Sequence, residues 1–227
     1  MENSVHKKSH KFWDDEVKQS KLVYVDTQVV RFMSGCRPDL ADNAGKKAIE
    51  IACGGGRNLI VLDDYGFEAH GLDFAENAIR EAQSLGARNK REFTLHHSSL
   101  EDFADTTDQK FDVVIWDSPF LAPQIDIENN LKRIHQIFSE GGVGWFAFRH
   151  PDTWFSKFGV AVDENCYELD ERAVGYEGAI YSFFEEAEAR SLLGDADFDV
   201  LNVERVELWK KGMSERNVWM HFWVTPK

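Results

Sequence analysis

Apolar positions along the chain switch between short continuous runs and helical spacing, a pattern that is typical of alternating strands and helices. The first run, at residues 48–52, carries one acid, Glu50, and leads into three glycines at 54–56. Residues 57–62 suit a helix, and the next short strand ends in Asp73, 17 residues after the last glycine. The pattern predicts a strand, a glycine turn, a helix and a second strand, and the rest of the chain is arranged around this unit.

The same alternation continues to the end of the chain. The expected strands are 92–96, 111–116, 143–148, 198–209 and 217–224, and the expected helices are 75–85, 127–138 and 182–193. Glycines are predicted to end the first two of these helices, at Gly86 and at 141–142. Ser182 is the expected N-cap of the third helix, with Glu185 completing a capping box. The last two strands are predicted to form a hairpin.

The expected domain organisation is an N-terminal helical cap at residues 1–44, followed by one α/β domain at 45–227. Residues 151–181 place aromatic side chains among acids and glycines, in a stretch longer than an ordinary connection. Because long excursions from a rigid sheet often carry function, this stretch is predicted to be a lid that sets substrate choice. In the cap, Trp13 and Tyr24 either close over a cofactor or pack on the core.

The glycine turn indicates which kind of ligand to expect. Glycines let a backbone come close to a ligand, and a carboxylate at the tip of the next strand accepts the hydroxyls of a ribose. A dinucleotide-binding turn needs a third glycine where this chain has Leu59, and no Lys-Ser or Lys-Thr pair follows as in phosphate-binding loops. The turn therefore suits a nucleoside that carries no phosphate.

Residues 50–56, Glu-Ile-Ala-Cys-Gly-Gly-Gly, resemble the first motif of the class I S-adenosylmethionine-dependent methyltransferases. That motif reads acid, aliphatic, Gly, Cys/Thr/Ser, Gly, any residue, Gly, and Ala52 replaces its first glycine. The pair Arg57-Asn58 and residues 71–74 resemble the small-molecule branch of the family. The resemblance covers the chain from about residue 45 onward. It implies a Rossmann-like, doubly wound α/β fold with a seven-stranded sheet whose last strand is antiparallel.

The resemblance also implies the cofactor S-adenosylmethionine and the residues around it. The cofactor-binding residues that it implies are Glu50, Ala52, Gly54, Gly56, Asn58, Asp73, Phe74, Ser99, Leu100 and Asp117. Asp73 would bind the ribose hydroxyls and Phe74 would flank the adenine. Ser99 and Leu100 would line the adenine edge, with Asp102 as an alternative to Ser99.

Two positions are expected to face the acceptor. Residues 117–120, Asp-Ser-Pro-Phe, resemble a signature of methyltransferases that act on amino nitrogens, in which Asp117 would hold the amine. The alternative is that Pro119 only ends the strand and Phe120 packs under the next loop. His150 follows the fifth strand and is the candidate general base, because imidazole titrates near neutral pH. Its alternative is an ordinary loop histidine.

Composition excludes several classes of partner and location. The net charge is −14, with 40 acids against 26 lysines and arginines, so the surface would repel nucleic acid. No apolar run approaches the ~20 residues of a membrane span, and three cysteines without CxxC spacing favour a reducing, cytoplasmic location. The adjacent His96 and His97 point to opposite faces of a strand, so no metal site is expected. The oligomeric state stays open.

The sequence therefore predicts methyl transfer from S-adenosylmethionine to an oxygen or nitrogen of a small-molecule acceptor. His150 would serve an alcohol and Asp117 an amine. The alternative is a non-catalytic S-adenosylmethionine- or nucleotide-binding regulatory module, and a third possibility is nicotinamide-dependent redox chemistry. Release of S-adenosylhomocysteine distinguishes the enzyme from the module, and a response to dinucleotide identifies the redox protein.

Overall fold

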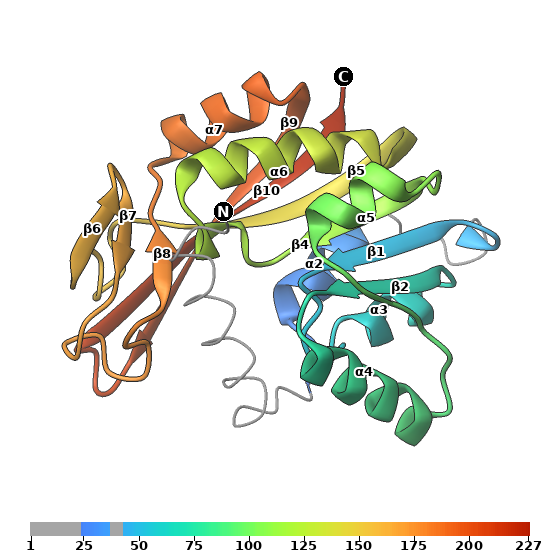
Figure 1. Ribbon diagram of the computed structural model, residues 1–227, viewed down its shortest axis with the longest axis horizontal. Helices are drawn as coiled ribbons and strands as arrows, with labels where there is room; N and C mark the ends of the chain where they lie inside the picture. Colours follow the sequence, from blue (N-terminus) through green and yellow to red (C-terminus); the bar gives the residue numbers. More distant parts are fainter. Residues whose placement is uncertain (1–23, 37–42) are drawn as a thin grey trace.

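A seven-stranded sheet lies between two layers of helices (Figure 1), in a computed structural model that describes residues 24–36 and 43–227. The strand order is β3-β2-β1-β4-β5-β10-β9, and β10 runs in the direction opposite to that of the other six strands. The predicted doubly wound sheet with an antiparallel last strand is confirmed. The strands are β1 (Lys47–Ile51), β2 (Glu68–Asp73), β3 (Thr94–His97), β4 (Phe111–Trp116), β5 (Phe138–Arg149), β9 (Phe198–Lys210) and β10 (Glu215–Pro226).

Helices cover both faces of the sheet, as the nearly all-apolar central strands require. One face carries α2 (Thr27–Cys36), α3 (Leu59–Asp64) and α4 (Glu76–Asn89), and the other carries α5 (Leu100–Thr106), α6 (Gln124–Gln136) and α7 (Glu186–Asp195). Each layer has its own core. In β1, Ala48 packs on the α2 and α3 side, whereas Ile49 and Ile51 pack on the α6 side.

A second, three-stranded antiparallel sheet occupies the stretch that is predicted to be a lid. Its strands are β6 (Val160–Asp163), β7 (Cys166–Glu168) and β8 (Ile180–Ser182). An aromatic cluster joins it to the short 3₁₀ helix η2 (Pro119–Leu121) after β4; its buried aromatic members are Phe120, Phe155, Tyr181 and Phe183. Phe120 stacks on Tyr181 with 5.4 Å between ring centroids, so the packing role considered for Phe120 is present.

The expected ends of two helices are wrong for local packing reasons. Gly86 lies inside α4, where an added Cβ would come within 3.0 Å of the Arg91 carbonyl oxygen. The helix ends instead at Asn89, and its C-cap is Lys90, whose φ is +55°. Gly141 and Gly142 lie in β5 rather than after α6. At Gly142 an added Cβ would lie 3.1 Å from the Phe111 carbonyl, where the register between β4 and β5 shifts.

The start of α7 also differs from the expectation. Ser182 is the last residue of β8, and its hydroxyl donates to the Ala122 carbonyl oxygen instead of capping a helix. Glu185 is itself the N-cap, and it forms the capping box with Glu188. The acidic residues after Phe184, rather than the serine, begin the helix.

Part of the predicted N-terminal cap lies outside the described residues, including Trp13. Within the described part, α2 contributes Val29, Phe32 and Met33 to the core on its face of the sheet. Tyr24 is 85% exposed. A boundary between a cap and the α/β domain at residue 44 stays a prediction.

The glycine turn after β1 has three residues with left-handed backbone dihedrals: Ala52 at φ +56°, Gly54 at φ +52° and Gly56 at φ +78°. At Gly56 an added Cβ would lie 2.9 Å from the Ala82 Cβ in α4, so this position also needs a glycine for packing. Ala52, which replaces the motif's first glycine, adopts the left-handed conformation at a cost of about 1–2 kcal/mol.

We expect Gly54→Ala to lower the free energy of unfolding by about 1 kcal/mol, because φ is positive and an added Cβ meets no atom of residues 24–36 and 43–227 within 4 Å. Ala52→Gly should leave stability equal or raise it by up to about 1 kcal/mol. Urea denaturation measures both. The matched control is Gly194→Ala, in α7, where φ is not positive and space is also open; it should stabilise the protein. Equal effects of the Gly54 and Gly194 substitutions would contradict the conformational argument.

Candidate active site

The carboxyl ends of β1, β2, β4 and β5 lie at one edge of the sheet, where ligands bind in open α/β folds. Asp73 ends β2 and is 7% exposed. Its Oδ2 accepts a hydrogen bond from the Gly54 N–H at 2.9 Å, and its Oδ1 accepts one from the Ala75 N–H at 2.8 Å. The carboxylate predicted to bind a ribose therefore also fixes the position of the glycine turn.

Glu50 lies buried in β1, directly below this turn. Its Oε1 accepts a hydrogen bond from Asn58 Nδ2 at 2.7 Å, and Asn58 Oδ1 accepts one from the Asp26 N–H at 2.9 Å. Among the described residues, none provides a hydrogen-bond partner for Glu50 Oε2. Burial raises the pKa of Glu50 to about 8, with Asn58 acting against the shift and Asp117 adding to it. Glu50 is therefore largely protonated at pH 7 and has one oxygen that a cationic ligand would satisfy.

Asp117 follows β4 and is more accessible than Glu50, with 30% of its side chain exposed. Arg57 Nη2 lies 3.3 Å from Asp117 Oδ2 and 3.3 Å from Asp26 Oδ2, so one guanidinium bridges two carboxylates. Burial of the carboxyl group, followed by the charge of Asp26, raises the pKa of Asp117 to about 7, and Arg57 and Arg149 oppose the rise. This carboxyl group changes charge near neutral pH.

The strand register shows which side chains share a face of the sheet. Ile115 in β4 pairs with Glu50 in β1 and with Trp145 in β5. Since side chains alternate along a strand, Glu50, Asp117 and Arg149 fall on the face that α2 and α3 cover. His150 falls on the opposite face. The two residues predicted to be catalytic, Asp117 and His150, are therefore on different sides of the sheet.

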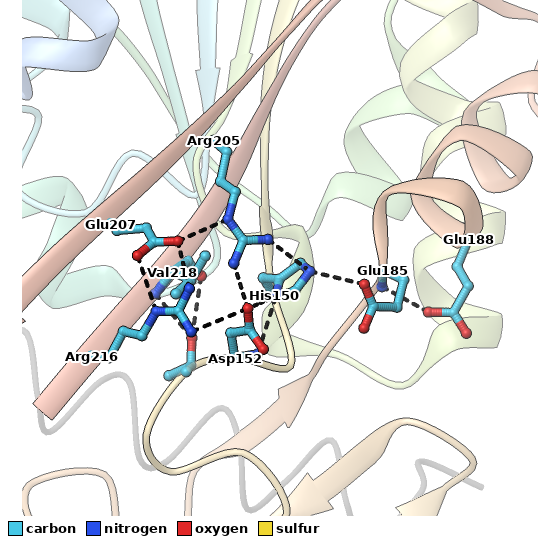
Figure 2. A network of polar contacts seen from close by, with 9 residues as sticks. His150, Asp152, Glu185, Glu188, Arg205, Glu207, Arg216 and Val218 are labelled. Carbon is cyan, nitrogen blue, oxygen red and sulfur yellow. Dashed lines mark hydrogen bonds and ion pairs between the residues drawn. The ribbon is translucent and has the colours of Figure 1, made fainter.

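His150 is buried in a polar network, which Figure 2 shows. Its Nδ1 accepts a hydrogen bond from the Asp152 N–H at 3.1 Å, and its Nε2 lies 2.9 Å from Glu185 Oε2 and 3.1 Å from Arg205 Nη1. Both ring nitrogens are engaged, so His150 must leave at least one of these partners to accept a proton from an acceptor. The catalytic role of His150 stays a prediction.

The rest of the network joins the long hairpin to the end of β5 (Figure 2). Arg205 in β9 and Arg216 in β10 both contact Asp152 and Glu207. The pKa of Glu207 is lowered to about 2 by its hydrogen bonds from these two arginines. The network holds α7, the hairpin and the chain after β5 together, which is a structural task.

The residues predicted to line the adenine lie after β2 and β3. Ser99 is the N-cap of α5: its Oγ accepts a hydrogen bond from the Asp102 N–H at 3.0 Å and donates one to Asp102 Oδ2 at 2.9 Å. The Phe74 carbonyl oxygen lies 3.0 Å from His97 Nε2, and Leu100 packs on the core. Contact of Phe74, Ser99 or Leu100 with an adenine stays a prediction.

His96 and His97 do not act together, in agreement with their opposite orientations in β3. His96 Nε2 lies 3.0 Å from His70 Nδ1, whereas His97 reaches the Phe74 carbonyl. Across residues 24–36 and 43–227, no cluster of three or more His, Cys, Asp or Glu side chains is placed to hold a metal ion.

Few atoms of the described residues pack against Gly54 and Gly55 in the turn. Among the described residues, an added Cβ at Gly54 would meet no atom within 4 Å, and one at Gly55 would meet the Glu81 Cβ alone, at 3.8 Å. Below the turn is the unsatisfied oxygen of Glu50, and beside it is Asp73. These residues fit a nucleoside that also carries a cationic group.

Sequence comparison identifies the central part of the chain. Residues 48–142 match a family model described as "Methyltransferase domain". A ubiquinone biosynthesis O-methyltransferase of Methylococcus capsulatus is 27% identical over 106 residues, which are 47% of this chain and 43% of that protein. The chain spans about half the length of the curated relatives it matches.

Structure comparison agrees on the fold. A Burkholderia thailandensis 1,6-didemethyltoxoflavin-N1-methyltransferase superposes with a TM-score of 0.68 at 15% identity, covering 98% of this chain and 91% of that one. An S-adenosylmethionine-dependent methyltransferase from Clostridium acetobutylicum superposes with a TM-score of 0.65 at 15% identity, covering 99% of both chains. Within the part of the chain that the structure describes, no helix has the length and apolar character needed to cross a membrane.

One prediction follows from the buried carboxyl group of Glu50. Its pKa is about 8 in the folded state against 4.5 ordinarily, so between these pH values the unfolded chain has lost a proton that the folded protein keeps. Stability should therefore fall as the pH rises from about 4.5 to 8. Glu50→Gln, which keeps an oxygen for Asn58, should be about as stable as the wild type at pH 5 and more stable by about 1–3 kcal/mol at pH 8.5.

Denaturant titrations at the two pH values test this, with the exposed Glu92→Gln as the matched control. The control should change stability equally at both pH values. The stability difference between the wild type and Glu50→Gln should change between the two pH values. If that difference is the same at pH 5 and pH 8.5, burial does not raise the pKa of Glu50.

Proposed function

We propose methyl transfer as the reaction of this chain, which belongs over residues 48–142 to the class I S-adenosylmethionine-dependent methyltransferases. The methyl group would pass from S-adenosylmethionine to an oxygen or nitrogen of a small-molecule acceptor. The observation that carries the proposal is the unsatisfied Glu50 oxygen beneath an open glycine turn, beside Asp73. A phosphate-free nucleoside with an ammonium group suits all three features.

The cofactor is assigned to this chain's residues as follows. The backbone of Gly54 and Gly56 would lie against the methionyl part, Asp73 would hold the ribose hydroxyls, and Glu50 would pair with the ammonium group. When bound, S-adenosylmethionine supplies a methyl group activated by a sulfonium. The structure of the similar B. thailandensis enzyme contains bound S-adenosylhomocysteine, which supports this assignment.

The protein's part in such a transfer is mainly to align the acceptor and to exclude water. Asp117 is also placed to contact the acceptor. It lies at the same edge of the sheet, and its pKa of about 7 suits a group that accepts a proton at neutral pH. We propose Asp117 as the proton acceptor for a hydroxyl, or as the group that holds an amine. Oxygen acceptors are favoured because the curated relatives are named as O-methyltransferases.

Other parts of the proposal concern the surroundings of the site. Residues 151–181, with the three-stranded sheet, would cover the acceptor, and residues 1–44, with α2, would form the cap on the other side. The net charge of −14 supports a small molecule rather than nucleic acid as the partner. A reducing, cytoplasmic location fits the three cysteines, none of which forms a disulfide.

The test is release of S-adenosylhomocysteine from S-adenosylmethionine in the presence of a panel of phenols, alcohols and amines. With an active acceptor, Asp117→Asn should lower kcat by about 10²-fold or more. The wild-type kcat/KM should fall as the pH drops below about 7, because Asp117 gains a proton there, and this limb should be absent in Asp117→Asn. The exposed Asp108→Asn is the control and should keep the wild-type profile.

His150→Ala, measured beside it, decides between the two candidate bases. We expect it to lower the rate with little change in cofactor affinity, while the limb near pH 7 persists. Loss of that limb in His150→Ala but not in Asp117→Asn would make His150 the base. S-adenosylmethionine binding without any release of S-adenosylhomocysteine would favour the non-catalytic module.

A further inference from the structure

Arg149 is the last residue of β5 and is almost completely buried, with 2% of its surface exposed. Four aromatic rings surround its guanidinium carbon. The ring centroid of Trp219, its partner in β10, is 4.1 Å away; those of Phe155, Phe120 and Tyr181 are at 5.0, 5.8 and 5.9 Å. These rings come from β10, from the loop after β5, from η2 and from β8. The cation lies in an aromatic enclosure where the two sheets meet.

Within the described residues, no carboxylate forms an ion pair with Arg149. Its Nη2 donates a hydrogen bond to Asn217 Oδ1 at 3.1 Å, which is a neutral oxygen, and its Nε has no hydrogen-bond partner among the described residues. Nor does any carboxylate in that part of the chain approach it within 4.0 Å, the distance of an ion pair. Burial lowers the pKa of Arg149, while the charges of Tyr181, Tyr176 and Asp117 and a side-chain hydrogen bond to the Tyr176 hydroxyl act against the shift.

Other arginines of this protein, which are less buried than Arg149, have carboxylate partners. Each of a set of five contacts at least one carboxylate: Arg57, Arg91, Arg133, Arg205 and Arg216. A buried cation without an anion is unfavourable, and an apolar side chain of similar size would fill the same space without the desolvation penalty. The positive charge at position 149 therefore needs an explanation other than packing.

The position of Arg149 supplies that explanation. It lies on the same face of the sheet as Asp117, on the neighbouring strand, and the two side chains influence each other electrostatically. A guanidinium recognises a planar carboxylate through two parallel N–H donors. Aromatic walls such as Phe120 and Tyr181 suit a flat molecule. The Nε–H without a partner is a donor that such a carboxylate would occupy.

We propose that Arg149 binds a carboxylate of the acceptor, so that the acceptor is a planar carboxylic acid whose hydroxyl or amino group lies toward Asp117. This proposal rests on the proposed function, because only a methyl-transfer reaction has an acceptor. The binding of a carboxylate at Arg149 can be measured without any methyl transfer. Arg149 is then the residue that sets specificity, while Asp117 handles the proton.

The test compares two probes of the same shape, 3,4-dihydroxybenzoate and 3,4-dihydroxybenzamide, which differ only in the charge of one substituent. Calorimetry with the full-length wild type should give a dissociation constant for the benzoate that is at least about tenfold lower, the scale of a hydrogen bond to a charged group. Arg149→Lys keeps a positive charge but loses Nε and the planar fork, and it should lose most of this preference.

The matched control is Arg172→Lys. Arg172 also lies over an aromatic ring, Phe158 at 4.9 Å, but it is exposed and already paired with Asp170. This variant should keep the wild-type preference for the benzoate. Thermal melting of both variants checks that they fold.

A second measurement uses the wild type, so it holds even when Arg149→Lys folds poorly. With ¹⁵N-labelled arginine, one buried Nε–H resonance should move saturably on addition of the benzoate and should stay in place with the benzamide.

Equal affinities for the two probes, absence of binding by either at millimolar concentration, or a preference that Arg149→Lys retains would each overturn the proposal. Release of S-adenosylhomocysteine with a neutral acceptor would then leave the proposed function standing. Conversely, tight benzoate binding by a protein that never binds S-adenosylmethionine would support Arg149 and reject methyl transfer.

Discussion

Burial of the Glu50 carboxyl group beneath the glycine turn is the constraint on which the site depends. Asn58 holds one of its oxygens, and the Asp26 backbone holds Asn58, so β1, the turn before α3 and the start of α2 are joined through one side chain. The other oxygen has no hydrogen-bond donor among the described residues. Burial disfavours the charged carboxylate and raises its pKa to about 8. A protein that keeps such a group gives up stability for binding, because a cationic ligand would favour the ionised carboxylate that the fold alone disfavours.

The charges around this carboxyl group divide the site into two halves. On the side proposed for the cofactor, the acids Glu50 and Asp73 lie close enough to influence each other electrostatically, which suits a ligand that brings its own positive charge. On the acceptor side, Arg149 is a cation without an ion-paired acid among the described residues. Asp117 lies between them and titrates near pH 7. Complementary ligands would therefore bring a cation to one half and an anion to the other.

Much of this architecture could be predicted from the sequence, because hydrophobic periodicity reports strands that are buried on both faces. The alternation around residues 48–73 and the final hairpin are in place, with boundaries that differ by a few residues. Composition predicts helix boundaries at Gly86, Gly142 and Ser182, because glycine and serine are common there. In the structure these residues instead contact Arg91, Phe111 and Ala122, and hydrophobic periodicity does not report such contacts. The sequence points to His150 because imidazole titrates near neutral pH, whereas the register of β4 and β5 places Arg149 on the face of Asp117. The aromatic enclosure around Arg149 is formed by four segments that are separate in the sequence, so no local pattern predicts it.

The most direct test of the account is calorimetric titration of the protein with S-adenosylmethionine at pH 7, repeated in buffers with different ionisation enthalpies. The account predicts binding by the wild type that releases a proton, because the ligand's ammonium group lowers the pKa of Glu50 from about 8. Glu50→Gln should bind more weakly and release fewer protons. Absence of binding, or proton release that is the same in Glu50→Gln, would contradict the claim that Glu50 binds the cationic group of a nucleoside.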